Sequence, residues 1–274
     1  MKNIHYTYST AELASYYGLT PKGLAYYEKK DIIHPERLDD SHYRSFSLED
    51  CYALYQSKFY SNCGYPLSEM AESIHHDDES EFCERIHRHV DAMKEQASRL
   101  IRMSECADWI AEVMKGAEKS TSYQIVTRPE TVRLHVRTYR KEHVFDKIKS
   151  DEFEQWNSAI PINIASLQYS YGMLMVGDQA DVDIGNIMLK KDFDHFGFAW
   201  NPDLNLLGEK QCMFTVLSVD SEAINQTEWL NPGLKWISDH GYFLDGDVIT
   251  GLLAVINSGS KKMRYDGVWF PVRK

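Results

Sequence analysis

LASYYGLTPKGLAYYEKKDIIHP, residues Leu13–Pro35, predicts two short helices joined by a tight turn. Gly18 ends the first helix, because glycine readily takes the left-handed conformation that closes a helix C-terminus. Thr20 can cap the second helix through its hydroxyl, and Pro21 suits the first helical position, where its missing N–H is not needed. The stretch therefore predicts a helix–turn–helix unit.

The second helix of this pair has two distinct faces. Leu24 points back toward the first helix, whereas Lys22, Ala25, Tyr26 and Lys29 share the outer side. A helix–turn–helix that presents amines and hydroxyls outward is typical of DNA-binding proteins. A plain structural hairpin can have the same spacing, so both interpretations stay open on these residues alone.

Capping residues mark three helix starts around this unit. Ser9 with Glu12 forms a capping box before the first helix, and Ser47 with Asp50 caps a helix that follows a turn-rich stretch, residues 36–46. Asp78-Glu79-Ser80-Glu81 is a third capping box, before a long helix. Each pairs a short polar side chain with an acidic one three residues later, as the motif requires.

Residues 8–74 resemble the MerR family of bacterial transcription regulators. The matching positions, in chain order, are Tyr8, Gly18, Leu24-Ala25-Tyr26-Tyr27-Glu28, Ile32-Ile33-His34-Pro35, Tyr43-Arg44, Ser47-Leu48-Glu49-Asp50 and Gly64-Tyr65-Pro66-Leu67-Ser68-Glu69-Met70. Two positions depart from the family pattern. Ala25 replaces the arginine of the recognition helix, which removes one phosphate contact, and His42 replaces the usual glycine of the wing.

The resemblance implies a winged helix-turn-helix domain at residues 1–76 that binds double-stranded promoter DNA and acts with RNA polymerase. Thr20, Lys22 and Tyr26 would approach base edges or adjoining phosphates, and Tyr27, Arg37, Tyr43 and Arg44 would hold the DNA backbone. The family also implies an over-long promoter spacer that a homodimer bends and untwists when a ligand binds. Deformation energy would then contribute to specificity.

The charge of this domain limits its DNA affinity. Residues 1–75 carry seven Lys and Arg against ten Asp and Glu, a net charge of −3. Because non-specific affinity comes mainly from neutralised phosphates, we expect modest, salt-sensitive binding through a local cluster of cations. These cations lie on the predicted recognition helix and wing: Lys22, Lys29, Lys30, Arg37 and Arg44.

Residues 77–119 predict one long helix with a heptad seam. Ile86, Met93, Leu100, Ala107 and Met114 recur every seven residues, and Val90, Ala97, Ser104 and Ala111 fill the complementary positions. So narrow an apolar seam needs a partner helix. A hairpin with a later helix is one solution and a homodimer is the other. No later segment shows a matching heptad, and the family's antiparallel dimerisation helix agrees with a homodimer.

Beyond residue 119 the apolar period changes from helical to strand-like. Strands are expected at Gln124–Arg128, Val132–Tyr139, Ile162–Tyr171, Met173–Val176, around Ile187, at Cys212–Val219, Val248–Ile256 and Gly267–Val272, with helical stretches from Val144 to Trp156 and from Trp229 to His240. A strand–helix–strand–strand unit used twice predicts an α+β domain over residues 120–274, with pseudo-twofold symmetry and a cleft between its halves.

This second half resembles the GyrI-like effector-binding domains that are often fused to MerR-type regulators. The resemblance depends on the Trp236–Tyr242 helix exit and on the closing Trp269-Phe270-Pro271-Val272. It implies a small-molecule effector. In drug-sensing relatives an acidic residue four before the closing proline attracts cations. Gly267 occupies that place here and Asp266 should face the other way, so a preference for lipophilic cations is not implied.

Aromatic side chains at cleft-facing positions would make an apolar pocket with a polar rim, the usual form of a small-molecule site. The candidate residues are Tyr171, Trp200 and Trp269 for stacking, with Asp266 or Glu209 as the charged partner. Two alternatives to this hypothesis stay open. In one, the second half is a hydrolase-like or scavenging module; in the other, the protein is a DNA-binding dimer that needs no small molecule.

The remaining patterns argue against other classes of protein. The five cysteines form no CxxC pair, and His75-His76 and His87-Arg88-His89 lack ligand spacing, so we expect free thiols and no metal or other cofactor. The longest apolar run, Val248–Ile256, is half a membrane span. A cytoplasmic protein without membrane association is expected. No nucleophile elbow, phosphate-binding loop or catalytic carboxylate pair is present, so the sequence does not predict an enzyme.

Overall fold

The computed structural model describes residues 7–37, 43–66, 69–71, 73, 78–119, 122–140, 143–144, 150–176, 182–259 and 261–274. The chain divides into two compact units, Met1–Ser98 and Arg99–Lys274. Helix α5 (Glu79–Lys119) begins in the first unit and ends in the second, in agreement with the long helix that the heptad pattern predicts.

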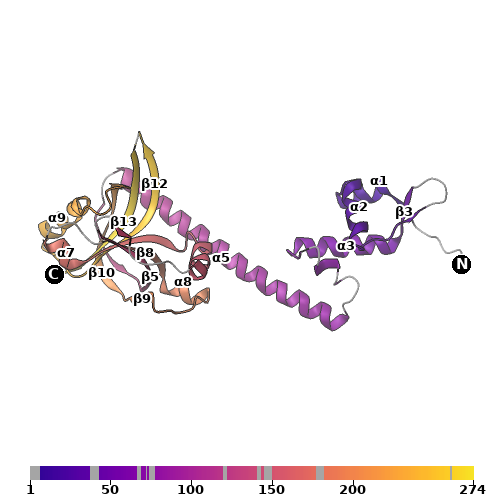
Figure 1. Ribbon diagram of the computed structural model, residues 1–274, viewed down its shortest axis with the longest axis horizontal. Coiled ribbons are helices and arrows are strands. Elements are labelled where there is room, and N and C mark those ends of the chain that lie inside the picture. The colour runs from indigo at the N-terminus through magenta and orange to yellow at the C-terminus, as the bar shows by residue number, and fades with distance from the viewer. Residues whose placement is uncertain are drawn as a thin grey trace. The chain divides into compact units, whose positions relative to one another are not determined.

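The first unit contains the predicted helix–turn–helix and wing (Figure 1). Its helices before α5 include α1 (Thr10–Tyr17), α2 (Pro21–Lys29) and α3 (Leu48–Asn62), and its small sheet has the order β1 (Tyr8–Ser9), β3 (Arg44–Phe46), β2 (Glu36–Arg37). Gly18 closes α1 at φ 62°, and the capping boxes of Ser9 with Glu12 and Ser47 with Asp50 are both present. The local signals in the sequence are confirmed.

The buried carboxylate of Asp50 links two segments of this domain through hydrogen bonds. Asp50 is 5% exposed, and its Oδ2 accepts hydrogen bonds from the backbone N–H and the hydroxyl of Ser47. Its Oδ1 accepts from the backbone N–H of His34 at 2.7 Å, just after α2. The apolar core lies beside it and includes Leu13, Leu24, Ile32, Ile33, Phe46 and Leu54. The start of α3 is therefore fixed to the end of the recognition helix.

In the described part of the second unit, ten strands form one antiparallel sheet. They are β4 (Gln124–Arg128), β5 (Thr131–Arg140), β6 (His143–Val144), β7 (Ile164–Tyr169), β8 (Val182–Leu189), β9 (Leu204–Leu207), β10 (Lys210–Asp220), β11 (Phe243–Leu244), β12 (Val248–Ser258) and β13 (Lys261–Arg273). The order is β4-β10-β13-β12-β7-β8-β5-β6, with β11 paired to β13 and β9 paired to β5. The helices are α6 (Ser150–Ser158), α7 (Tyr171–Val176), α8 (Lys190–His195), the 3₁₀ turn Glu228–Leu230 and α9 (Asn231–Asp239).

The sheet is built from one motif used twice. The first copy runs β5, α6, β7, β8 and the second runs β10, α9, β12, β13. The copies join where β7 pairs with β12, with Tyr169 opposite Val248 and Gln168 opposite Ile249. Outward from this join the strand order is β12-β13-β10 on one side and β7-β8-β5 on the other. The predicted strand–helix–strand–strand duplication is therefore confirmed.

The structure corrects two details of the predicted element pattern. Met173–Val176 belongs to helix α7 and not to a strand. The first backbone N–H of α7, that of Tyr171, donates to Asp247 Oδ1 at 2.8 Å, so a distant side chain satisfies this helix end. Val144 lies in β6 and not in a helix, whereas Phe145 and Ile148 fall outside the described residues.

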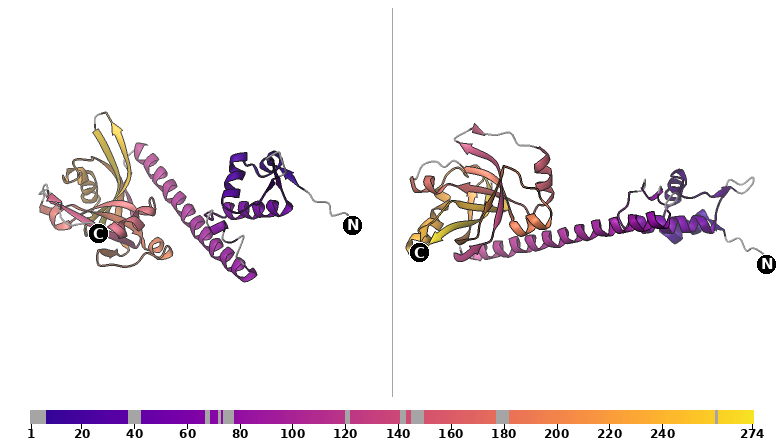
Figure 2. Two further views of the ribbon diagram at one scale, coloured as in Figure 1. Left: turned by 45° about the vertical axis from the view of Figure 1, so that its right-hand side comes forward. Right: turned by 90° about the horizontal axis from the view of Figure 1, so that it is seen from below.

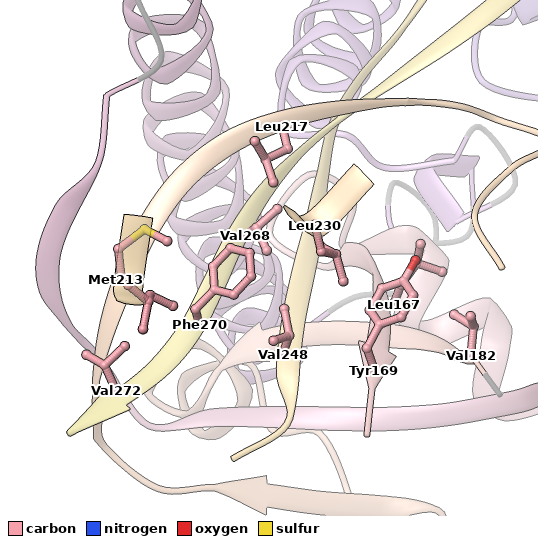
Figure 3. Close-up of a cluster of buried hydrophobic side chains, with 11 residues drawn as sticks. Leu167, Tyr169, Val182, Met213, Leu217, Leu230, Val248, Val268, Phe270 and Val272 are labelled. Atoms are coloured by element: carbon pink, nitrogen blue, oxygen red, sulfur yellow. The ribbon is translucent and has the colours of Figure 1, made fainter. Parts of the chain in front are cut away.

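Buried apolar side chains of the second unit form two clusters. In the first, Tyr169, Val248, Val268 and Phe270 pack with residues of α9 and the 3₁₀ turn (Figure 3). The other cluster includes Trp156, Phe193 and Phe198 together with Cys106 of α5. The C-terminal part of α5 thus runs alongside the strands of the second unit, as both views in Figure 2 show. No helix in the described ranges is both long and apolar enough to cross a membrane.

Candidate functional site

The recognition helix α2 presents a polar face because its apolar side is buried. Leu24 is 1% exposed in the core, whereas Lys22 and Tyr26 are exposed on the opposite side. The Thr20 hydroxyl accepts a hydrogen bond from the backbone N–H of Gly23 at 3.0 Å, which makes it the cap of α2. Lys30 Nζ lies 5.8 Å from the centroid of the Tyr26 ring. A cation and an aromatic ring therefore share this exposed face.

A single carboxylate links the recognition helix to the wing. Glu28 Oε2 accepts a hydrogen bond from Arg44 Nε at 2.8 Å, and Glu28 Oε1 lies 3.5 Å from Arg37 Nη2. The Arg37 side chain is 59% exposed and that of Arg44 is 34% exposed, so both guanidinium groups also face solvent. The sequence contained Glu28 in its family motif, but its part in orienting the two arginines required the packed structure.

The other predicted DNA-binding residues have mixed surroundings. Tyr43 is 73% exposed next to β3, where a DNA backbone could reach it. Tyr27 packs against the apolar core, and burial raises the pKa of its hydroxyl. His42 and the turn between β2 and β3 fall outside the described residues. The exposed members of the predicted set are therefore Thr20, Lys22, Tyr26, Arg37 and Tyr43, with Arg44 partly exposed.

The predicted dimer seam of α5 is largely at the surface of the single chain. Val90, Met93 and Leu100 are 37%, 44% and 57% exposed. Ala97, Ala107 and Ala111 are also exposed, Met114 is partly buried, and Ile86 packs against the cluster of Tyr60, Tyr65 and Met70. Apolar side chains repeat at heptad spacing on a helix whose own chain leaves most of them uncovered.

The second unit contains a cavity of about 250 Å³ between α5 and the sheet. Helix α5 supplies one wall through Arg102, Glu105, Cys106 and Trp109. The remaining lining residues are Arg128, Pro129, Thr131, Ile162, Ile164, Ile187, Met188, Leu189, Asp192, Ile249 and Trp269. A more open hollow of about 520 Å³ adjoins it and shares Trp109, Pro129 and Trp269. The two indole rings are stacked, with centroids 6.5 Å apart and planes 14° apart.

Four charged residues line this cavity, and three of them form one ion-paired group. Arg102 donates from Nε and Nη2 to the two oxygens of Asp192, at 2.8 and 2.9 Å, and from Nη1 to Glu105 Oε2 at 2.9 Å. These carboxylates raise the pKa of the Arg102 guanidinium, chiefly through the hydrogen bonds of Asp192. The fourth residue, Arg128, donates from Nη2 to the Gly208 carbonyl at 3.1 Å, and burial lowers the pKa of its guanidinium.

The five predicted ligand-binding residues do not lie together. Trp269 lines the cavity, but Tyr171 starts α7, and Trp200 is half-exposed beside Phe193. Glu209 lines a separate surface hollow with Lys190, Lys191 and Asp194. The sequence did not single out Arg128 or Trp109, because Arg128 comes near Trp269 through the pairing of β4, β10 and β13, and Trp109 through the packing of α5 on the sheet.

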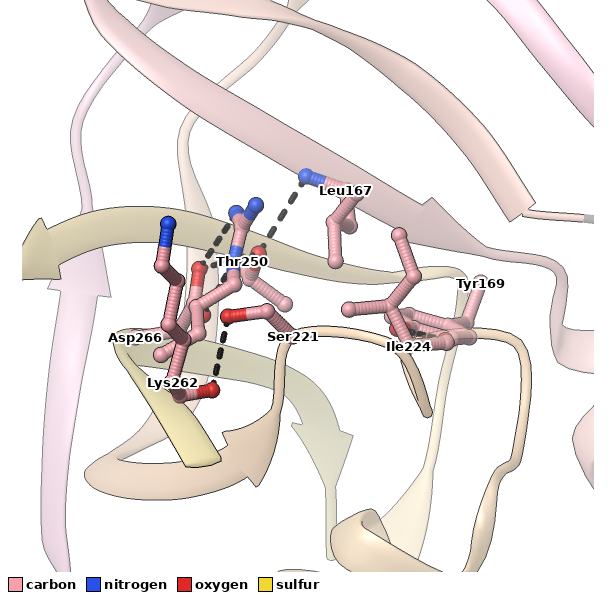
Figure 4. A network of polar contacts seen from close by, with 8 residues as sticks. Leu167, Tyr169, Ser221, Ile224, Thr250, Lys262 and Asp266 are labelled. Carbon is pink, nitrogen blue, oxygen red and sulfur yellow. Dashed lines mark hydrogen bonds and ion pairs between the residues drawn. The ribbon is translucent and has the colours of Figure 1, made fainter. Parts of the chain in front are cut away.

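Asp266 points into the core on the opposite side of β13 from Trp269, since the two are three residues apart on a strand. It is fully buried, and Arg264 Nε and Nη2 donate to its oxygens at 2.6 and 2.8 Å. The Thr250 hydroxyl also donates to it and accepts from the backbone N–H of Leu167 (Figure 4). Asp266 is thus a structural anion whose partners are within the protein, which argues against the ligand-binding role expected for it.

In the described part of the chain, no group of three or more His, Cys, Asp and Glu side chains is arranged to hold a metal ion. The exposed Cys83 and the partly buried Cys63 lie in the first unit, and Cys51, Cys106 and Cys212 are buried; all five are free thiols. His75 and His76 fall outside the described residues, and the ring of His89 stacks on Tyr65 with centroids 3.3 Å apart.

Comparison with known proteins gives a family for the first domain. Residues 8–76 match the model described as MerR HTH family regulatory protein. Among solved structures, the chain is similar to EcmrR in a cryo-EM structure of the EcmrR–DNA complex in EcmrR-RPo, at 12% identity over 97% of this chain and 100% of that chain, with a TM-score of 0.37. Curated protein sequences give no match.

Two shorter solved structures are also similar to this chain. A MerR-family transcriptional regulator from Bacillus cereus shares 23% identity over 39% of this chain and 81% of that chain, with a TM-score of 0.36. HiNmlR, a MerR family regulator lacking the sensor domain and bound to promoter DNA, shares 21% identity over 42% and 94%, with a TM-score of 0.35. From the family match and the geometry above, residues 8–76 form a helix-turn-helix domain of the MerR family.

Proposed function

We propose that this chain is a ligand-responsive transcription regulator that binds double-stranded promoter DNA as a homodimer and acts with RNA polymerase. The observation that carries the proposal is that α5 contributes both to the expected dimer interface and to the cavity. This helix follows a MerR-type domain and bears the exposed heptad seam, and its C-terminal part supplies one wall of the cavity in the second unit.

The DNA-binding half of the proposal draws on the exposed face of α2 and on the wing. Lys22 and Tyr26 are exposed on this face and would approach base edges or phosphates, and Arg37, Tyr43 and Arg44 would approach the backbone. Glu28 holds Arg44 beside the recognition helix and neutralises part of its charge. A DNA phosphate must therefore compete with this carboxylate, which agrees with modest, salt-sensitive affinity.

The ligand-responsive half draws on the cavity. A dimer that needs no small molecule would fill this space with its own aromatic side chains, yet Trp109 and Trp269 border an open volume of about 250 Å³. A molecule in this volume would touch α5, and a difference in these contacts between two arrangements of the paired helices would favour one of them. A coupling free energy of about 1–3 kcal/mol between ligand and DNA is enough for regulation.

The DNA-binding role is tested with Arg44→Ala. The probe is a duplex selected from a random pool by the wild-type protein, and binding is followed by fluorescence anisotropy at several salt concentrations. We expect weaker binding, and we expect the salt slope to fall by about 1 for each phosphate that the variant no longer neutralises. The wild-type complex should contain two chains per duplex.

Arg88→Ala is the matched control, because it removes the same charge from an exposed position on α5. It should leave affinity and salt slope close to wild type. An Arg44→Ala protein that is folded by circular dichroism and binds the duplex as the wild type does at two salt concentrations would contradict the wing assignment.

A further inference from the structure

Arg128 carries a charge that the described part of the chain does not neutralise. It is 8% exposed, its Nη2 donates to a backbone carbonyl, and its Nε has no hydrogen-bond partner among the described residues. A buried guanidinium without an anionic partner is costly, so buried arginines are normally paired with carboxylates. The nearby group that favours its charged form is the Cys212 thiol, and burial raises the pKa of that thiol to about 11. At neutral pH this thiol is protonated and supplies no negative charge.

The carboxylates that line the same cavity are already engaged. Both oxygens of Asp192 and one oxygen of Glu105 accept hydrogen bonds from Arg102. A cationic ligand would have to share these carboxylates with Arg102. An anionic ligand meets no such competition, because Arg128 lines the cavity and has no carboxylate partner among the described residues.

The rest of the cavity suits an apolar, flat molecule. Trp109 and Trp269 present stacked indole rings, and Phe214 contacts Trp269 with ring centroids 5.0 Å apart. Isoleucine side chains cover the sheet side of the cavity. The adjoining hollow along α5 shares both indoles and provides room for a longer body. An aromatic group between these walls would bury apolar surface on both of its faces.

We propose that the cavity binds an organic anion, with an aromatic or other apolar body beside Trp109 and Trp269 and a carboxylate or similar acidic group on Arg128. This inference deepens the proposed function and rests on it, since it names the chemical class of the effector. Arginine suits this task because its planar guanidinium keeps its charge when buried and offers several N–H donors to one carboxylate. The ligand would supply the missing counter-charge, so Arg128 would select for an acid over a neutral or cationic molecule of the same shape.

The test uses three probes of nearly equal shape and different charge: 1-naphthoate, the neutral 1-naphthamide and the 1-naphthylmethylammonium cation. Binding to the full-length wild-type protein is measured by calorimetry and by quenching of tryptophan fluorescence. We expect naphthoate to bind about tenfold more tightly than the other two, or better, which corresponds to about 1.4 kcal/mol. Arg128→Met should remove this preference, and Arg128→Lys should keep part of it.

Arg273→Met is the matched control, because it removes an arginine whose side chain is 67% exposed in the same unit. It should leave the order of the probes unchanged. Thermal unfolding separates binding from folding: Arg128→Met should unfold at the wild-type temperature or above, since it replaces an unpaired buried charge by an apolar side chain.

Equal or tighter binding of the amide or the ammonium probe, or no binding of any probe, would overturn the inference. So would an Arg128→Met protein that stays folded and keeps the preference for naphthoate. The DNA-binding half of the proposed function is measured separately with Arg44→Ala. A cavity that prefers the amide would leave ligand-responsive regulation standing and exclude the anion alone.

Discussion

The helix-turn-helix domain and the sheet domain satisfy their polar groups over very different distances along the chain. In the first, Ser9 pairs with Glu12 and Ser47 with Asp50, each across three residues. In the second, the hydrogen bonds of Arg102 to Asp192 span 90 positions. The helix caps of the first domain are therefore stabilised by local interactions, whereas the second domain depends on charged groups that lie far apart in the sequence. Substitutions in the two domains should consequently differ in how much they lower the free energy of unfolding and in how much of the domain they affect.

The largest effect is expected from Asp192→Asn, which leaves Arg102 without its buried counter-charge. The free energy of unfolding of the second unit should fall by about 3–5 kcal/mol, because removing one partner of a buried pair strands the other charge. All six tryptophans lie in this unit, so urea denaturation followed by tryptophan fluorescence reports on it directly.

Glu105→Gln is the control for that measurement. It removes the other carboxylate that contacts Arg102, but the Glu105 side chain is 59% exposed. The free energy of unfolding should fall by about 1 kcal/mol or less, as for other exposed pairs. Equal decreases for the two variants would contradict the distinction between a buried long-range pair and an exposed local one.

The next effect is a decrease in stability at alkaline pH through Cys212. Burial raises the pKa of this thiol from near 9 to about 11, so between these values the folded chain keeps a proton that the unfolded chain releases. Stability from this group is complete below the unfolded pKa and falls as pH rises through the folded pKa, by about 3 kcal/mol in all. Urea denaturation under reducing conditions across this range should show the decline.

Cys212→Ala should lack that part of the alkaline decline, whereas Cys83→Ala should retain it, because Cys83 is exposed. Other groups that titrate at high pH contribute equally to all three proteins, so the difference between variants isolates Cys212. Parallel curves for wild type and Cys212→Ala would show that burial of this thiol does not couple the sheet domain to pH.

The smallest effect is expected from a helix cap in the first domain. Ser47→Ala removes the hydroxyl that accepts a hydrogen bond from the backbone N–H of Asp50. The free energy of unfolding should fall by about 1 kcal/mol. Ser47→Gly should cost only a few tenths of a kcal/mol, since glycine is a better N-cap than alanine. Hydrogen exchange followed by mass spectrometry should show faster exchange at the start of α3 and unchanged exchange in the sheet domain. An equal increase in the exchange rate in both domains would contradict the expected difference between them.

The recognition face could be predicted because its determinants are local. Gly18, Thr20 and Pro21 fix where α1 ends and α2 begins, and helical spacing then places Lys22 and Tyr26 on the outer side. The duplicated motif of the second unit could also be predicted, from alternating apolar residues and from the order of strands and helices. Helix α7 could not, because the acceptor at its start is Asp247, which lies 76 positions from Tyr171.

The cavity separates what local sequence signals predict from what depends on the packing of the folded domain. The caps, the heptad seam and the repeated motif could be predicted from the sequence, since each follows from side-chain chemistry and spacing within a short stretch. The pairing of Asp192 with Arg102 depends on the tertiary structure, as does the place of Arg128 in the cavity wall without an anionic partner among the described residues. The physical reason is that charge pairing depends on distance in space, which the sheet sets between residues far apart in the chain.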